Sequence, residues 1–180
     1  MTRLLAAVDA ISGILTAISL ALLLVLVGDM IYEVASRRLF SAPTLWAYDI
    51  AYMANGAGFV FAAAYTLRHN GHIRIDFLSS RLPRRAQDGI NFAAYLVLIL
   101  PALAILVAGA YSAWLRAWLT GEVDPASPWK PVMWPFYAAM TVGFAALWLQ
   151  ATAEGVRHAR SAFGGGPSPL DHAPEDVPEA

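Results

Sequence analysis

The chain of 180 residues is 58% hydrophobic and 14% charged, and its mean hydropathy is +0.54. Soluble domains carry about 25% charged residues, so this chain has too little polar surface for water alone and lipid must be part of its solvent. The net charge of −1 gives no sign of a nucleic-acid partner. The sequence contains no cysteine, which excludes disulfides, thiolate nucleophiles and cysteine-ligated metals.

Four apolar segments are each long enough to cross about 30 Å of hydrocarbon, which takes roughly 20 helical residues. The predicted spans cover residues 4–32, 46–67, 90–118 and 132–156. A bilayer accepts only a backbone that satisfies its own hydrogen bonds, so all four should be helices. The first apolar run is too long for the core of a signal peptide, which takes about 7–15 residues. We therefore predict an all-α membrane protein with four transmembrane helices, formed by residues 1–160.

Glycine, proline and charged residues mark the connections between the spans. Residues 33–44 hold two arginines and a proline and are expected to form a brief helix in the membrane interface. Residues 120–131 hold one glycine and three prolines and should form a turn-rich loop. Pro101 falls inside the third span and should bend it. Residues 161–180 are acidic and rich in Gly and Pro, so we expect a disordered tail.

The longest connection follows the second span and contains the sequence Gly-His-Ile-Arg-Ile-Asp, which begins at Gly71. Gly71 can adopt a positive φ where the span ends, and Asp76 can cap a short helix over residues 77–82. Arg74 can reach a lipid phosphate, and His72 can pair with Asp76 or with a backbone carbonyl. We favour a structural role for this segment over a role in transport, because it lies outside the hydrocarbon.

The two sides of the membrane differ in their number of basic residues. An even number of spans puts both termini on one side, together with the connection between the second and third spans. That side holds eight basic residues, namely Arg3, Arg68, Arg74, Arg81, Arg84, Arg85, Arg157 and Arg160. The other side holds four, namely Arg37, Arg38, Arg116 and Lys130. Because loops rich in Arg and Lys stay cytoplasmic, we expect both termini in the cytoplasm.

Most of the tryptophans fall near the outer ends of the predicted spans. They are Trp46, Trp114, Trp118, Trp129 and Trp134. Aromatic residues at that depth anchor a protein in the membrane interface. Trp and Arg are also enriched at protein contacts, so Trp129 and Trp134, with Arg116 and Lys130, are candidates for docking a partner. Membrane anchoring is the simpler interpretation for each of them.

The spans lack the groups on which a membrane enzyme or a self-sufficient pump depends. Haem held between helices needs axial ligands, usually His. The histidines all fall outside the predicted spans, at His69, His72, His158 and His172. A proton-coupled exporter needs an acidic residue deep in the membrane, whereas the acidic residues here lie near the ends of the spans. No serine has a base placed beside it, so we predict no catalytic residue, no cofactor and no metal site.

Small residues line one side of the second predicted helix. Ala54, Gly58 and Ala62 recur at four-residue spacing, which lets two helices approach closely in lipid. Asn55 on the same helix can hydrogen-bond to a neighbouring helix. Two interpretations are open at this point: the surface packs inside the chain's own bundle, or it contacts a larger partner subunit.

Charged residues also flank the first two spans on the outer side. Asp49 lies where the second span begins, and Arg37 and Arg38 lie just past the first. A guanidinium stabilises a carboxylate near a membrane interface and can bind it through two hydrogen bonds. We therefore predict that Asp49 pairs with Arg38 and fixes the two helices to each other. The alternative is a set of solvated charges that contribute little.

Three local patterns follow one another along the four spans. They are Arg38-Leu39-Phe40 with Trp46-Ala47-Tyr48-Asp49, then Gly-His-Ile-Arg-Ile-Asp, then Trp134-Pro135-Phe136-Tyr137 with Val142-Gly143-Phe144. In this order they resemble the small membrane subunit, of the DctQ type, of the tripartite ATP-independent periplasmic (TRAP) transporters. The resemblance covers nearly the whole chain before the acidic tail, and Gly-His-Ile-Arg-Ile-Asp is its most specific part. The family usually has Glu where this chain has Asp49, which shortens the reach of the carboxylate by one methylene.

The resemblance implies a role and partners. Such a subunit forms a complex with a large multi-span permease subunit, which carries the substrate and sodium sites. A periplasmic binding protein delivers the solute, typically a carboxylate. We therefore expect a non-catalytic scaffold in a bacterial inner membrane that braces the large subunit, helps to present a docking surface and serves uptake of an organic acid. The alternatives are a membrane-anchor subunit of a respiratory or other enzyme complex, and a stand-alone exporter, which the lack of a midplane carboxylate opposes.

Overall fold

Long helices make up most of the protein. The computed structural model describes residues 2–68 and 83–164. Its elements in chain order are α1 (Thr2–Leu39), α2 (Ala47–Arg68), α3 (Arg84–Ala94), the π-helical turn η2 (Tyr95–Ile99), α4 (Leu100–Thr120) and α5 (Trp134–Gly164). α3, η2 and α4 follow one another without a break and form one continuous helix. The described residues therefore contain four continuous helices, each long and apolar enough to cross a membrane. The prediction of an all-α protein with four spans is confirmed.

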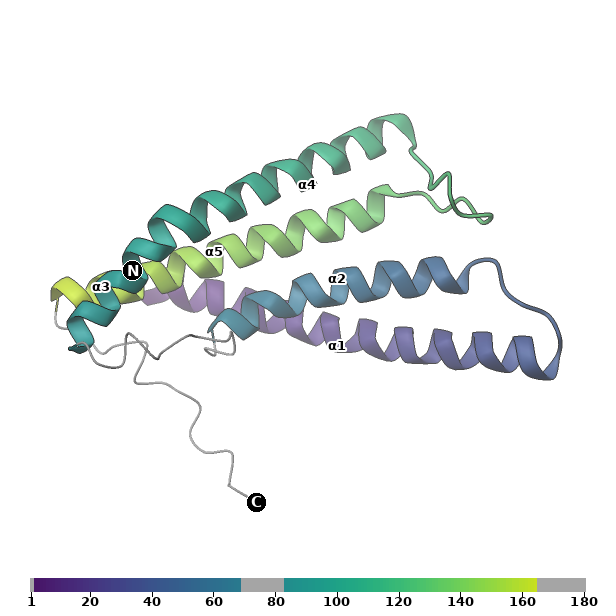
Figure 1. The fold of residues 1–180 in the computed structure, drawn as a ribbon, viewed down its shortest axis with the longest axis horizontal. Coiled ribbons are helices and arrows are strands. Elements are labelled where there is room, and N and C mark those ends of the chain that lie inside the picture. The colour runs from purple at the N-terminus through teal and green to yellow at the C-terminus, as the bar shows by residue number, and fades with distance from the viewer. Residues whose placement is uncertain (1, 69–82, 165–180) are drawn as a thin grey trace, which may run out of the picture.

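The helices form two antiparallel hairpins, α1–α2 and α4–α5, which lie side by side (Figure 1). α5 is the central helix and packs against α1, α2, α3 and α4. The connections within both hairpins, residues 40–46 and 121–133, lie at one end of the molecule, here called the loop end. The start of α1, α3 and the last turns of α5 lie at the opposite end, here called the terminal end.

Small side chains fill the interface between α1, α2 and α5. The core cluster consists of Leu15, Ala57, Phe61, Ala64 and Ala146. Gly143 lets α2 approach α5 closely, since a Cβ atom at this position would lie 2.5 Å from Cγ1 of Val60. Large aliphatic side chains point outward instead, and Leu24 on α1 and Ile105 on α4 are 74% and 73% exposed. This arrangement is expected where lipid or a partner subunit covers the apolar surface.

α1 ends at Leu39, whereas the sequence predicted a separate interfacial helix over residues 33–44. That prediction is wrong for a local reason. No proline or glycine interrupts the helix here, and Glu33 pairs with Arg37 four positions later, with 2.5 Å between Oε1 and Nη2. The chain reverses only at Ser41, whose φ is 51°.

The bend predicted at Pro101 stays a prediction, and the structure shows a change in helix type just before this residue. Tyr95–Ile99 form a π-helical turn, and Pro101 follows in the first turn of α4. In a π turn each backbone N–H bonds to the carbonyl five residues earlier instead of four. The hydrogen-bond register therefore changes just before Pro101, which has no backbone N–H to donate. The same continuous helix begins at Arg84, six residues before the predicted span.

The α4–α5 connection is the turn-rich loop that the sequence predicts. Gly121 ends α4 in the left-handed conformation, with φ of 63°. Val123 and Val132 then form an isolated antiparallel bridge, and the Met133 N–H donates to the Glu122 carbonyl at 2.9 Å. These contacts give the loop a defined shape at the start of α5. The predicted short helix over residues 77–82, and residues 165–180 of the predicted tail, lie outside the described residues.

Candidate functional site

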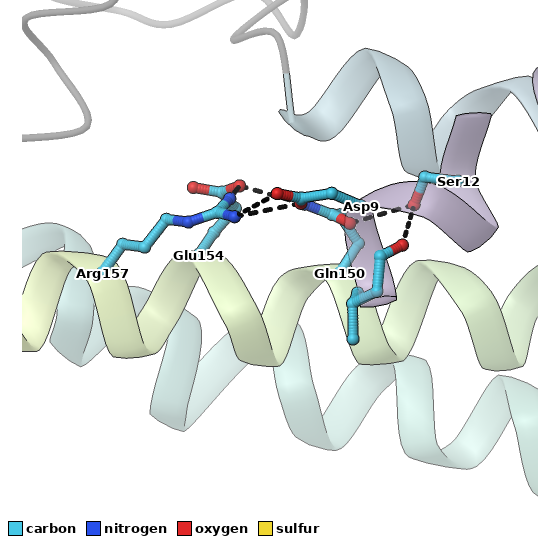
Figure 2. Close-up of polar contacts among 6 residues, drawn as sticks. Asp9, Ser12, Gln150, Glu154 and Arg157 are labelled. Carbon is cyan, nitrogen blue, oxygen red and sulfur yellow. Dashed lines mark hydrogen bonds and ion pairs between the residues drawn. The ribbon is translucent and has the colours of Figure 1, made fainter. Parts of the chain in front are cut away.

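A cluster of polar side chains joins α1 to α5 at the terminal end (Figure 2). This Asp9–Arg157 cluster consists of Asp9, Ser12, Gln150, Glu154 and Arg157. Arg157 donates through Nη2 to both carboxylate oxygens of Asp9, at 2.7 and 3.0 Å, and through Nη1 to Glu154. Gln150 is fully buried and donates to Asp9 at 3.2 Å and to Glu154 at 3.1 Å. The Gln150 carbonyl oxygen accepts from the Ser12 hydroxyl at 2.9 Å.

The charged side chains of the cluster are hydrogen-bonded to one another across the interface between α1 and α5. A buried ion pair is stable only when its remaining hydrogen-bonding groups are also satisfied. The guanidinium of Arg157 bridges carboxylates from two helices, and the amide of Gln150 donates to the same two carboxylates. We infer that the cluster locks the beginning of α1 onto the end of α5.

A second cluster joins α3 to α5 at the same end. His158 Nδ1 and Asp88 Oδ1 lie 2.7 Å apart, and the Ser161 hydroxyl donates to the other Asp88 oxygen. All three side chains are buried, and the His158 ring stacks on Tyr95 with 5.7 Å between ring centroids. The apolar runs of the sequence place every histidine outside the predicted spans, but α5 continues to Gly164 and His158 lies inside this helix.

Sequence reasoning did not single out either cluster, although a signal is present. Gln150, Glu154, His158 and Ser161 follow one another at three- and four-residue spacing, which places them on one face of a helix. An apolar helix with a polar stripe buries that stripe against polar partners. If the helical spacing is followed past the apolar run, the fourth helix extends beyond the predicted span and these four residues lie on one buried polar face of it.

Asp49 contacts the α4–α5 loop at the other end of the molecule. The Ser127 hydroxyl donates to the Asp49 carboxylate, and the Trp129 N–H donates to the Ser127 oxygen at 3.1 Å. Asp49 and Ser127 are both buried. The predicted pair between Asp49 and Arg38 is therefore wrong, because Asp49 ties the start of α2 to the second hairpin instead of to α1.

The arginines after the first span have different surroundings. Arg37 pairs with Glu33, and the same carboxylate accepts from the Thr44 N–H at 3.0 Å. Glu33 thus holds the α1–α2 turn in place. Arg38 is exposed and makes no ion pair with the residues that the structure describes. Asp29 lies one turn before Glu33, and both of its carboxylate oxygens are buried without a hydrogen-bond partner in the described ranges.

Aromatic pairs connect neighbouring helices at the loop end. Trp46 stacks on Tyr32 of α1, with 5.5 Å between ring centroids. Trp134 meets Trp118 of α4 edge to face at 4.8 Å. Trp129 in the loop is 45% exposed. The paired rings, here called the aromatic level, lie near the loop ends of all four helices, which is the pattern of residues at a membrane interface.

The Asp9–Arg157 cluster lies one hydrocarbon thickness from this aromatic level. Ser12 lies 20 residues from Tyr32 along α1, and Glu154 lies 20 residues from Trp134 along α5. At about 1.5 Å of rise per residue, both intervals measure about 30 Å. The aromatic pairs and the polar cluster therefore mark the two boundaries of the membrane-spanning layer.

The small-residue surface of α2 divides between an internal contact and an open groove. Gly58 packs on α1, and its carbonyl oxygen accepts from the Ser19 hydroxyl at 2.7 Å. The interpretation as packing within the chain therefore holds for Gly58. Asn55 is exposed and lines a groove of about 250 Å³ between α1 and α2, so contact with a partner stays a prediction for this residue.

The remaining predictions concern the segment after the second span and metal binding. Gly71, His72, Arg74 and Asp76 lie outside the described residues, so their structural role stays a prediction. Within residues 2–68 and 83–164, no group of three or more His, Asp or Glu side chains is placed to hold a metal ion. The described polar side chains serve to join helices.

Comparison with known proteins agrees with this architecture. The family described as the DctQ component of tripartite ATP-independent periplasmic transporters matches residues 26–161, which is about three quarters of the chain. The sialic acid TRAP transporter small permease protein SiaQ of Vibrio cholerae serotype O1 is 23% identical over 99 residues, which cover 55% of this chain and 57% of that protein. The match therefore spans somewhat more than half of this curated relative.

A DctQ component is part of a transporter, so the family match decides against a membrane anchor for an enzyme complex. It also explains why the polar contacts of the described helices fix helix positions rather than assemble a reacting site. The chain is a multi-pass membrane protein and a transport component, not an enzyme, and it belongs to the DctQ family of small permease subunits of TRAP transporters.

Proposed function

We propose that this chain is the scaffold subunit of a sodium-coupled importer, that it braces a large permease subunit and that it widens the surface on which a periplasmic binding protein docks. The family supports both partners, the large permease subunit and the periplasmic binding protein, because its transporters are tripartite. The exposed apolar side chains of α1 and α2 support the brace, because large side chains such as Leu24 and Phe59 are uncovered in the chain alone.

One observation carries this proposal, which is the distribution of charged side chains along the helices. Those that join separate elements lie in two layers, at the loop end and at the terminal end. The stretches between these layers contain no Asp, Glu, Lys or Arg, namely residues 10–28, 50–67, 89–115 and 135–153. Such a body is fixed at both ends but offers no charge in the middle of the hydrocarbon to bind a sodium ion or a carboxylate. Transport then falls to the partner subunit.

We further propose that both termini face the cytoplasm of a bacterial cell, across the inner membrane. The start of α1 and the end of α5 lie at the same end of the molecule, where Asp9 contacts Arg157. The excess of Arg on this side supports the cytoplasmic assignment. The loop end then faces the periplasm, and exposed Trp129 and Lys130 belong to the surface that a binding protein reaches.

The solute is proposed to be an organic acid, as is typical of the transporters that the sequence resembles. Reconstitution in vesicles tests the function directly. Three preparations are compared: the chain alone, the large subunit alone and both together, each with the purified binding protein outside. With an inward sodium gradient and labelled carboxylates that include sialic acid, we expect uptake only in the third preparation and its loss when potassium replaces sodium. Uptake by the chain alone would overturn the proposal.

A further inference from the structure

The outward face of α2 carries a stripe that the folded chain leaves uncovered. Tyr48, Tyr52, Asn55 and Phe59 are all exposed. They follow one another at spacings of four, three and four residues. This is the 3.5-residue period with which one helix packs along another at a small crossing angle. The stripe therefore has the pattern of a helix-packing seam, although among the described residues only Phe136 of α5 makes a ring contact with it, at Tyr52.

Asn55 is the polar member of this stripe. It lies nine residues, or about 13 Å, from Trp46 at the aromatic level, which puts its amide well inside the hydrocarbon. Its side chain makes no hydrogen bond to the residues that the structure describes. An amide that faces acyl chains loses the hydrogen bonds that it makes in water, whereas an amide between transmembrane helices recovers them.

A groove beside Asn55 can accept side chains of a neighbouring helix. It measures about 250 Å³ and runs between α1 and α2, with Leu20 and Leu23 on one wall and Phe59 on the other. Ala54 and Gly58 form the floor between these walls, where Gly58 already packs on α1, so the open part of the groove is lined by the larger side chains and Asn55. Small residues with one polar group beside them are the usual surface of helix association in membranes.

We propose that this surface, the Asn55 face (Tyr48, Tyr52, Asn55 and Phe59 on α2 with Leu20 and Leu23 on α1), binds one transmembrane helix of the large permease subunit, and that this helix hydrogen-bonds to the Asn55 amide. The proposal rests on the proposed function and adds to it which face of the chain meets the partner. The depth of Asn55 requires a partner inside the bilayer, which excludes the periplasmic binding protein. The tripartite family supplies one such partner, the large subunit.

Cross-linking tests the face. The sequence contains no cysteine, so a single introduced cysteine is the only thiol of this chain. Phe59→Cys probes the Asn55 face, and Ile105→Cys on α4 is the matched control. The two side chains are 78% and 73% exposed, and each lies 13 residues from a tryptophan of the aromatic level, Trp46 or Trp118. Each variant is labelled with a thiol-reactive photocross-linker in membranes that contain both subunits.

We expect a cross-link to the large subunit from position 59 and none from position 105. A cross-link from position 105 alone, a cross-link from position 59 to a second copy of this chain, or lipid adducts alone at position 59 would each overturn the inference. Co-purification of the unmodified chain with the large subunit is measured in the same membranes. If the subunits co-purify and the cross-link comes from α4, the proposed function stands and only the face is wrong; if they do not co-purify, both fail.

A second measurement addresses the hydrogen bond itself. Asn55→Ala removes the amide from an exposed helical position, and Ser112→Ala removes an exposed hydroxyl that already donates to the Gly109 carbonyl of its own helix. We expect Asn55→Ala to weaken the complex by about threefold to tenfold in detergent titration, and Ser112→Ala to leave it unchanged. Equal affinities for Asn55→Ala and the unmodified chain would overturn the assigned hydrogen bond.

Discussion

Arg157 and Asp9 lie 148 positions apart in the chain, yet Nη2 of the arginine contacts both carboxylate oxygens of the aspartate, at 2.7 and 3.0 Å. The contact joins the first turns of α1 to the last turns of α5. The same guanidinium donates to Glu154, so one positive charge serves carboxylates on two helices. This side chain, with Gln150, therefore joins α1 to α5 at the terminal end.

Arg157→Ala should destabilise the chain more than Arg160→Ala, a change three positions later on the same helix. It leaves Asp9 and Glu154 largely buried without their cation, which costs about 3 kcal/mol for a partly screened buried pair. Thermal unfolding in detergent measures the loss. Arg160→Ala is the control, since Arg160 makes no ion pair within the described ranges, and it should stay within about 0.5 kcal/mol of the unmodified chain. Equal thermal unfolding midpoints for the two variants would show that the Asp9–Arg157 cluster does not hold α1 on α5.

Gly143→Ala should separate α2 from α5. The added Cβ atom would lie 2.5 Å from Cγ1 of Val60, so the helices must shift, at a cost of about 1–3 kcal/mol. Gly109→Ala is the matched control on α4, where no atom lies within 4 Å of the added methyl group and the higher helix propensity of Ala stabilises. Unfolding midpoints should move in opposite directions. Adding Val60→Ala to Gly143→Ala should restore part of the loss, and a double variant no more stable than the single one would contradict the assigned contact.

Asp29 and Glu33 form a natural comparison, because each is 8% exposed and they lie one turn apart on α1. The Glu33 carboxylate accepts from Arg37 and Thr44, whereas both oxygens of Asp29 are buried without a partner in the described part of the chain. Asp29→Asn removes an uncompensated charge and should raise the stability of the isolated chain by about 1 kcal/mol. Glu33→Gln should lower it by a similar amount. Titration with a denaturant in detergent micelles measures the free energy of unfolding of both variants. A loss of stability in Asp29→Asn would show that the Asp29 carboxylate has a partner.

The contact between Asp49 and Ser127 should fix the α4–α5 loop. A spin label on Ala126→Cys, the only thiol of the chain, reports the mobility of this loop by electron paramagnetic resonance. Ser127→Ala should increase the mobility, because the loop loses its hydrogen bond to the start of α2. Asp49→Asn keeps an acceptor oxygen and should change the spectrum much less. A spectrum that Ser127→Ala leaves unaltered would mean that the bridge between Val123 and Val132 alone holds the loop.

The sequence predicts the elements of this fold better than the contacts between them. The apolar runs are sufficient to find four helices, because a bilayer forces such runs into helices, and Gly121 with its following prolines is sufficient to predict the loop. The end of α1 was missed because residues 33–39 include charged side chains, yet they favour a helix and contain an internal ion pair. Polarity ended the predicted span, but it does not end a helix.

The candidate contacts could not be paired from sequence because their partners are distant in the chain. Asp49 was predicted to pair with Arg38, a cation just past the first span, yet its partner is Ser127, a neutral residue 78 positions away. Charge gives no hint of such a partner, whereas helical spacing does mark the buried polar face of Gln150 and His158. Position along a helix was therefore more informative than charge.

Co-purification tests the central claim, that this chain acts by bracing a large permease subunit, most directly. The affinity-tagged chain is produced together with that subunit, extracted in mild detergent and purified by the tag, with the Arg157→Ala variant beside it. The account predicts that the unmodified chain brings down the large subunit and that the variant, in which the hairpins are unlocked, recovers several-fold less of it. Recovery of an intact, helical chain without the large subunit would contradict the account.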